Sequence, residues 1–173
     1  MINETLRRAT AWLQDATYGV NAQLAAVPRD AGDAQPANVV VFADEASHED
    51  AALGRSPETV PAIVVTVESA RMINDQVVHE VGDGEVVLNL RLYVADVDAK
   101  DAKRDASYYL RALSWCVRKW VAQSPGGSAR TKNSVQIVEI GAMEFNALYE
   151  SKDDRIVAGG ARLALTVRDV GLA

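Results

Sequence analysis

Two adjacent stretches with different hydrophobic periods constrain the fold of this chain more than any other feature of its sequence. Between Glu85 and Ala95 every second residue is apolar: Val86, Leu88, Leu90, Leu92 and Val94. This alternation is typical of a strand with one covered face and one partly wet face. Between Asp98 and about Gln123 the apolar residues recur at steps of three and four, which predicts an amphipathic helix. The chain therefore combines a sheet with a long helix that covers it.

The remaining segments extend this α+β pattern. An apolar stripe predicts a first long helix from Asn3 to Leu24, which ends before Pro28. Gly82-Asp83-Gly84 predicts the turn of an extended hairpin from Gln76 to Ala95, because these residues readily supply positive φ angles. Further strands are predicted at Asn38–Ala43, Ala62–Ser69, Val135–Ile140 and Ala161–Val167. The expected fold is a mainly antiparallel sheet with two long helices packed on one face and an extended hairpin.

The length favours a single domain. A chain of 173 residues is near the usual size of one domain, and a domain of this size buries roughly 70% of its unfolded surface. No internal repeat is visible. The stretch from Arg29 to Pro61 is rich in proline, glycine and acidic residues, and only Asn38–Ala43 within it resembles a strand. We therefore expect a long acidic loop region there, and loops of that length are candidate contact regions.

The charge balance restricts the partners. Lys and Arg total 18 against 24 Asp and Glu, a net charge of −6, whereas proteins that grip phosphates usually carry the opposite balance. We do not expect tight non-specific binding to DNA or to an anionic membrane. An acidic surface would instead suit a protein that DNA must slide past without sticking. The single cysteine excludes an internal disulfide, and no apolar run approaches the ~20 residues of a membrane span. The N-terminus lacks the apolar core of a signal peptide, so we expect a cytoplasmic protein.

Asp96 and Asp98 form the best candidate for catalysis, because an acidic pair at the end of a strand can hold Mg²⁺. The pair resembles the first motif of haloacid-dehalogenase-type phosphatases, but Lys100 stands where that motif has Thr or Val. A calcium loop is also a poor match, because Ser107 occupies its last acidic position. Asp98 is better explained as a helix cap, with Asp101 in the favourable first turn.

The other reactive side chains lack partners in the sequence pattern. His48 and His79 have no second histidine four residues on, and a zinc site needs three or four donors. Cys116 lies on the apolar stripe of the second helix without a base, so it is expected to be a small buried hydrophobe. The glycines lack the spacing of a phosphate-binding loop. We therefore expect no catalytic residue, no metal and no cofactor, and so no enzyme.

A second face of the predicted helix at Asp98–Gln123 carries Trp115, Tyr108, Arg111 and Arg118. Trp and Arg are enriched at protein interfaces, which makes this face a candidate contact surface. Trp is also largely buried in monomers, so strands could cover Trp115 instead. The acidic residues Asp44, Glu45 and Glu49 of the loop region are the other candidate interface residues.

The arrangement resembles the tail-terminator proteins of long-tailed bacteriophages. The matching parts are a first helix like Asn3–Leu24, a hairpin like Gln76–Ala95, a helix like Asp98–Gln123 and closing strands like Ala161–Val170. The resemblance extends over most of the chain, but it consists of the order of the elements and includes no sequence motif. It therefore assigns no role to any residue. It implies a virion protein, assembled in the host cytoplasm, that forms a homo-oligomeric ring of six copies. Such a ring caps the tail tube and contacts the major tail tube protein and the head connector. DNA passes through the ring without specific binding, and no membrane is a partner.

Three alternatives stay open. The loop region at Arg29–Pro61 is longer than in the smallest tail terminators, which leaves another neck protein, such as a head-completion protein. A small Mg²⁺-dependent hydrolase would use Asp96 and Asp98. A free-standing binding module is the third possibility.

Overall fold

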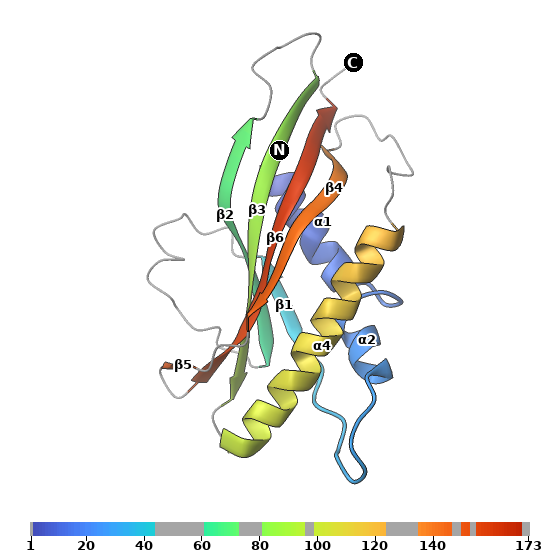
Figure 1. Cartoon of the computed structure of the whole chain (residues 1–173), viewed down its shortest axis with the longest axis vertical. Coiled ribbons are helices and arrows are strands. Elements are labelled where there is room, and N and C mark those ends of the chain that lie inside the picture. Colours follow the sequence, from blue (N-terminus) through green and yellow to red (C-terminus); the bar gives the residue numbers. More distant parts are fainter. Residues whose placement is uncertain are drawn as a thin grey trace.

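The computed structural model describes residues 2–43, 61–72, 81–95, 99–123, 135–146, 150–152 and 155–170. Three helices and six strands lie within these ranges (Figure 1). The helices are α1 (Ile2–Leu13), α2 (Val20–Ala26) and α4 (Ala99–Gln123). The strands are β1 (Val40–Ala43), β2 (Ala62–Met72), β3 (Val81–Ala95), β4 (Val135–Asn146), β5 (Glu150–Lys152) and β6 (Arg155–Val170).

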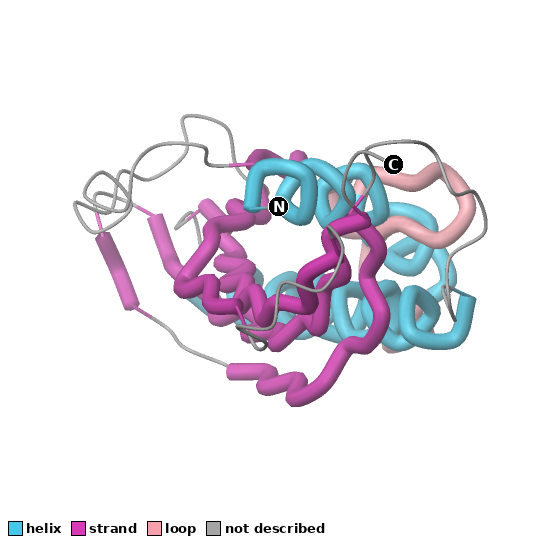
Figure 2. Tube along the Cα trace, turned by 90° about the horizontal axis from the view of Figure 1, so that it is seen from above, coloured by secondary structure: helices cyan, strands magenta, loops and turns pink. Residues whose placement is uncertain are grey.

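The strands form one mixed sheet in the order β1-β2-β3-β6-β4, with β5 paired to the end of β6. β1 runs parallel to β2, and the other pairings among the described strands are antiparallel. The helices lie together on one side of this twisted sheet, as the view from above shows (Figure 2). The α+β class predicted from the sequence is therefore confirmed.

The inner face of β3 forms the centre of the core. Val86, Leu88, Leu90, Leu92 and Val94 are all buried, as their alternation predicts. In the ladder with β6, Val86 lies opposite Leu165, Leu88 opposite Leu163 and Leu90 opposite Ala161. On the outer face Asn89 is half-buried and Arg91 is exposed, while Val87 and Tyr93 are buried.

The predicted hairpin turn at Gly82-Asp83-Gly84 is wrong. β3 continues through these three residues, which pair with Asp169, Arg168 and Val167 of β6, and Gly84 also pairs with Met72 of β2. Pairing with β6, and at Gly84 also with β2, satisfies backbone hydrogen bonds here and outweighs the local turn preference of glycine and aspartate. The predicted strand at Gln76–Val81 falls mostly outside the described residues.

The single helix predicted from Asn3 to Leu24 is also wrong, because the chain leaves the helical path after Leu13 and α2 begins only at Val20. The carboxylate of Asp15 accepts hydrogen bonds from the backbone amides of Thr17 (2.8 Å) and Tyr18 (2.7 Å). These two bonds lower the pKa of Asp15 and hold a turn that competes with the helix. Gly19 precedes α2 in an extended conformation (φ −65°, ψ 172°).

One hydrophobic core joins the helices to the sheet. α1 and α2 contribute Leu6, Ala9, Leu13, Val20 and Leu24 to the core, whereas Ala16 of the predicted apolar stripe is exposed in the turn between the two helices. α4 contributes Ala106, Tyr109, Ala112, Leu113, Cys116, Val117 and Trp120. α4 agrees with the predicted second helix, because one stripe of it is buried and the opposite stripe is exposed.

Candidate functional site

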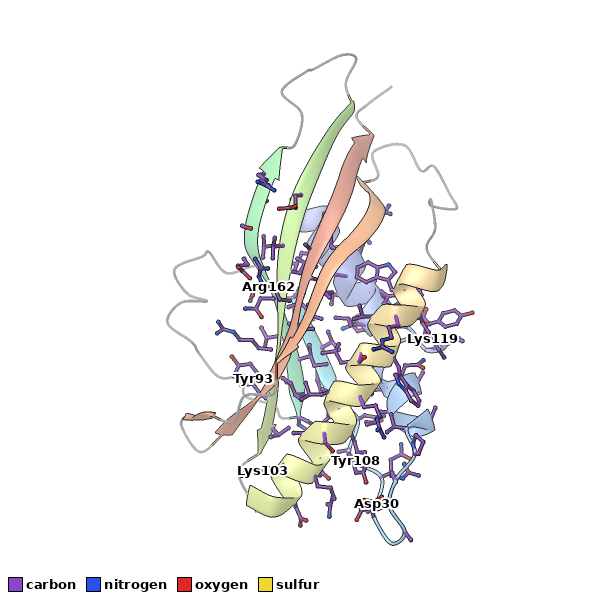
Figure 3. All side chains as sticks on the ribbon, in the orientation of Figure 1. Asp30, Tyr93, Lys103, Tyr108, Lys119 and Arg162 are labelled. Atoms are coloured by element: carbon purple, nitrogen blue, oxygen red, sulfur yellow. The ribbon has the colours of Figure 1, made fainter. Side chains whose placement is uncertain are left out.

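The C-terminal half of α4 exposes three cations. Arg111, Arg118 and Lys119 are exposed, while Trp115 beside them is half-buried and packs against the core. We call Arg111, Trp115, Arg118 and Lys119 the α4 cationic face. Lys119, which points away from the sheet in Figure 3, is the member that the sequence interpretation missed. Lys119 lies four residues after Trp115, and this spacing places both on the same side of a helix, so it could have identified Lys119 from the sequence.

Tyr108 does not belong to this face, because its side chain is buried. Its hydroxyl donates a hydrogen bond to Asp33 Oδ2 (2.8 Å) and accepts one from the backbone amide of Asp30 (3.3 Å). Figure 3 shows Tyr108 directed toward the loop that carries Asp30. The bond from Asp30 lowers the pKa of Tyr108, but the bond to Asp33, burial and the two nearby carboxylates together raise it. Tyr108 is therefore an anchor for that loop.

We call residues 28–38, which connect α2 to β1, the strap. Two further residues of α4 fix it: Tyr109 donates to the carbonyl of Ala37 (2.7 Å), and Arg104 Nη1 lies 3.7 Å from Asp33 Oδ1. Burial raises the pKa of Tyr109, and the hydrogen bond to Asp105 raises that of Arg104. The first part of the predicted loop region, residues 29–37, is therefore a loop held against α4, and the strand predicted at Asn38–Ala43 is present as β1. Residues 44–60, with Asp44, Glu45 and Glu49, lie outside the described residues.

The outer edge of β1 is occupied by side-chain amides. Asn21 of α2 accepts a hydrogen bond from Val39 N (2.8 Å) and donates one to Val39 O (2.9 Å), so its amide pairs with the backbone as another strand would. Gln14 donates to Val41 O (3.0 Å). Unpaired edge strands invite pairing with other chains, and these amides close that edge to strand addition. No pattern in the sequence signalled this arrangement.

The outer face of β1 presents apolar surface. Val40 and Phe42 are each 39% exposed, and they are the exposed large hydrophobic residues of the described chain. Their neighbours Val39 and Val41 alternate with them and are buried in the same core as α4. Val40 and Phe42 therefore point away from the core, and we call them the β1 apolar pair.

Replacing Asn21 by alanine is expected to lower the free energy of unfolding by about 1–2 kcal/mol, because two backbone groups of Val39 lose their partner. The opened edge should also increase self-association at high protein concentration. Urea denaturation and light scattering measure the two effects. The control is Gln35→Ala in the exposed strap, and equal stability of the two variants would contradict the closed edge.

Cys116 is fully buried in the core between α4 and the other elements. Burial raises the pKa of its thiol to about 12, against a small opposing effect of Trp12. The indole of Trp12 also donates a hydrogen bond to the backbone carbonyl of Cys116 (3.0 Å). A reactive cysteine needs a lowered pKa and access to solvent, so this thiol is not a nucleophile in the folded protein.

The pH dependence of stability tests this assignment. The unfolded thiol ionises near pH 9 and the folded one near pH 12, so the unfolded state releases its proton first. The stabilising contribution of the buried, protonated thiol is therefore complete below pH 9. Above pH 9 this contribution falls by up to about 1.4 kcal/mol per pH unit. We expect Cys116→Ala to show a shallower decline in unfolding free energy between these pH values. Tyr109, whose pKa is also raised, contributes equally to both proteins, so equal slopes would contradict the prediction.

The described residues contain no group of three or more His, Cys, Asp or Glu side chains placed to hold a metal ion. Asp96, Asp98, His48 and His79 lie outside the described residues, so the structure does not place the proposed acidic pair. No helix in the described ranges is long and apolar enough to cross a membrane. Comparison of the sequence with models of known protein families and with curated proteins found no match.

Proposed function

We propose that this chain is a structural virion protein of a long-tailed bacteriophage, a tail terminator that forms a ring at the head–tail joint. In this proposal six copies cap the tail tube and connect it to the head. The ring contacts the major tail tube protein on one side and the head connector on the other, and DNA passes through it. The work of such a protein is binding and geometry, without a chemical step.

The proposal rests on one observation: a single subunit has two exposed surfaces that differ in chemistry. A head-to-tail ring needs two different patches that complement each other. The β1 apolar pair and the α4 cationic face lie on different elements, both point away from the core, and they differ in chemistry. Aromatic residues and arginine beside apolar groups are typical of interface centres.

The disposition of the reactive groups supports a non-catalytic role. Cys116 is buried, and the hydroxyls of Tyr108 and Tyr109 hold the strap on α4. In the described chain, the thiol therefore packs in the core and the two hydroxyls form structural hydrogen bonds. A metal-dependent phosphatase activity that is lost in Asp96→Asn/Asp98→Asn would contradict this role.

In the proposed ring, the long strands β2 and β3 contact a neighbouring protein. β2 and β3 are consecutive and pair antiparallel from Ala62↔Tyr93 to Met72↔Gly84. At ~3.3 Å per residue, the 15 residues of β3 extend for about 50 Å. In the proposal β2 and β3 act as an extended hairpin arm that contacts a neighbouring subunit or the tail tube.

Electron microscopy of a phage lysate tests the proposal. With a stop codon early in this gene, we expect DNA-filled heads beside tail tubes of uncontrolled length, because nothing blocks further addition of tube protein. A head-completion protein would instead leave tails of normal length and heads that leak DNA or fail to join. Infectious particles at normal yield would contradict both roles.

A further inference from the structure

The two ends of the sheet each leave a strand with one described neighbour. At one end β1 is short, and Ala43↔Val65 is its last pair with β2. Over residues 66–72, β2 therefore has one neighbouring strand among those described, β3. At the other end β4 has one described neighbour, β6. We call these two margins of the sheet, residues 66–72 and 135–146, the β2 edge and the β4 edge.

The β2 edge directs backbone hydrogen-bonding groups away from β3. Val40 N donates to Pro61 O (3.0 Å), so β2 turns the backbone groups of every second residue from Pro61 toward β1. Ile63 belongs to this set, and its side chain lies in the core. Val67 and Ala70 also pack against the core, on either side of the bulge in this strand. By the same alternation, their N–H and C=O groups point away from β3.

The β2 edge differs from the neighbouring edge of β1. Asn21 and Gln14 bond the outward backbone groups of β1, whereas no side chain of the described residues bonds those of Val67 or Ala70. The exposed β1 apolar pair lies in the strand that ends where the β2 edge begins. Strand addition gains affinity from backbone hydrogen bonds and specificity from adjoining side chains. The β2 edge therefore suits an added strand.

We infer that copies of this chain join head to tail by strand pairing, with the β4 edge of one copy against the β2 edge of the next. The inference rests on the proposed ring and names its subunit contact. Three antiparallel pairings separate β2 from β4, so these strands run in opposite directions at opposite margins of the sheet (Figure 1). A second copy placed beside the first in the same orientation therefore brings antiparallel strands together.

The use of two different edges favours a ring or a filament over a symmetric dimer. Pairing of β4 with β4 about a twofold axis would leave the β2 edge with β3 as its one described neighbour. Head-to-tail contact instead gives a second strand to both edges of every subunit. The β2 edge limits the new ladder to the length of residues 66–72, because β1 occupies the preceding part of β2.

Amide hydrogen exchange tests the contact in the unmodified protein. Outward amides of residues 66–72 and 135–146 gain partners in the contact, so they should exchange about tenfold or more slowly in the assembled protein than in the dilute monomer. β3 is the internal control, because both of its neighbouring strands belong to the same subunit. Exchange in β3 should change much less. Analytical ultracentrifugation measures the oligomers, and mass spectrometry of peptides resolves the segments.

A proline in the β2 edge provides an independent test. Ala70→Pro removes one outward N–H, so it should weaken association about tenfold or more. Ala70→Val is the matched control, because valine has as many side-chain carbon atoms as proline and keeps the N–H. It should associate like the wild type. Circular dichroism shows whether both variants fold, and the exchange experiment decides the contact if Ala70→Pro does not.

The outcomes separate this contact from the ring itself. Oligomers with unchanged exchange in residues 66–72, or equal association of the two folded Ala70 variants, overturn the contact and leave the ring to form through other surfaces. Slower exchange confined to residues 135–146 would indicate a symmetric pair of β4 strands and also overturns it. A wild type that stays monomeric overturns the contact, while the lysate experiment decides the tail-terminator role independently.

Discussion

Gly160→Ala is expected to lower the free energy of unfolding by about 3 kcal/mol or more, because an added methyl group would collide with backbone in the centre of the sheet. Gly160 of β6 pairs with Arg91 of β3, and it is buried. A Cβ atom there would lie 1.8 Å from the carbonyl oxygen of Leu90. The collision involves backbone, so no side-chain rotation relieves it and β3 must move. The expected fall in melting temperature is about 10 °C.

Gly32→Ala is the matched control, because the same substitution there meets no atom within 4 Å. Gly32 has a φ of +95°, so alanine costs about 1 kcal/mol through the backbone conformation alone. Urea denaturation monitored by far-ultraviolet circular dichroism compares the two variants. Equal losses in both would show that β3 and β6 do not approach closely at Gly160.

Gly19→Ala is expected to cost about 2–3 kcal/mol by forcing open the turn between α1 and α2. A Cβ atom at Gly19 would lie 2.3 Å from the carbonyl oxygen of Asp15 and 2.6 Å from that of Leu13. The turn also positions Tyr18, whose ring stacks on Trp12 with centroids 5.5 Å apart, and Trp12 stacks in turn on Trp120 at 6.0 Å. Near-ultraviolet circular dichroism should therefore lose intensity together with stability.

Thr17→Ala is the control for this turn, because it removes atoms from an exposed side chain and adds none. It should change stability by no more than about 0.5 kcal/mol and leave the near-ultraviolet signal intact. A Gly19→Ala protein with normal stability and an unchanged aromatic signal would contradict the tight turn.

The sequence predicted the elements whose periodicity and packing agree. The alternation at Val86–Val94 and the stripe of α4 were correct, because each places its apolar residues on one buried face. The hairpin turn at Gly82-Asp83-Gly84 and the unbroken helix from Asn3 to Leu24 were wrong because contacts with other residues outweighed the local pattern. β3 continues through its glycines by pairing with β6, and the hydrogen bonds of Asp15 to the amides of Thr17 and Tyr18 hold the turn between α1 and α2.

The candidate site was predicted less completely, because its geometry depends on contacts between distant segments. Arg111 and Arg118 were placed correctly on an exposed face, since helical spacing alone determines that face. Tyr108 was not, because its partners Asp30 and Asp33 lie more than 70 positions away. The closure of the β1 edge by Asn21 depends equally on a contact between separate segments. Side-chain amides carry no periodic signal that would reveal such a partner.

The position of β6 in the sheet determines when this domain can fold during synthesis. β6 lies between β3 and β4, yet its pairs with β3 join residues 60 to 89 positions apart. The edge of β3 that faces β6 stays unpaired until β6 has been synthesised. Nascent chains paused between α4 and β6 therefore expose this strand edge to chaperones and to one another. The pairing of β3 with β6 is therefore expected to form late in folding, because it joins segments that are distant in the sequence.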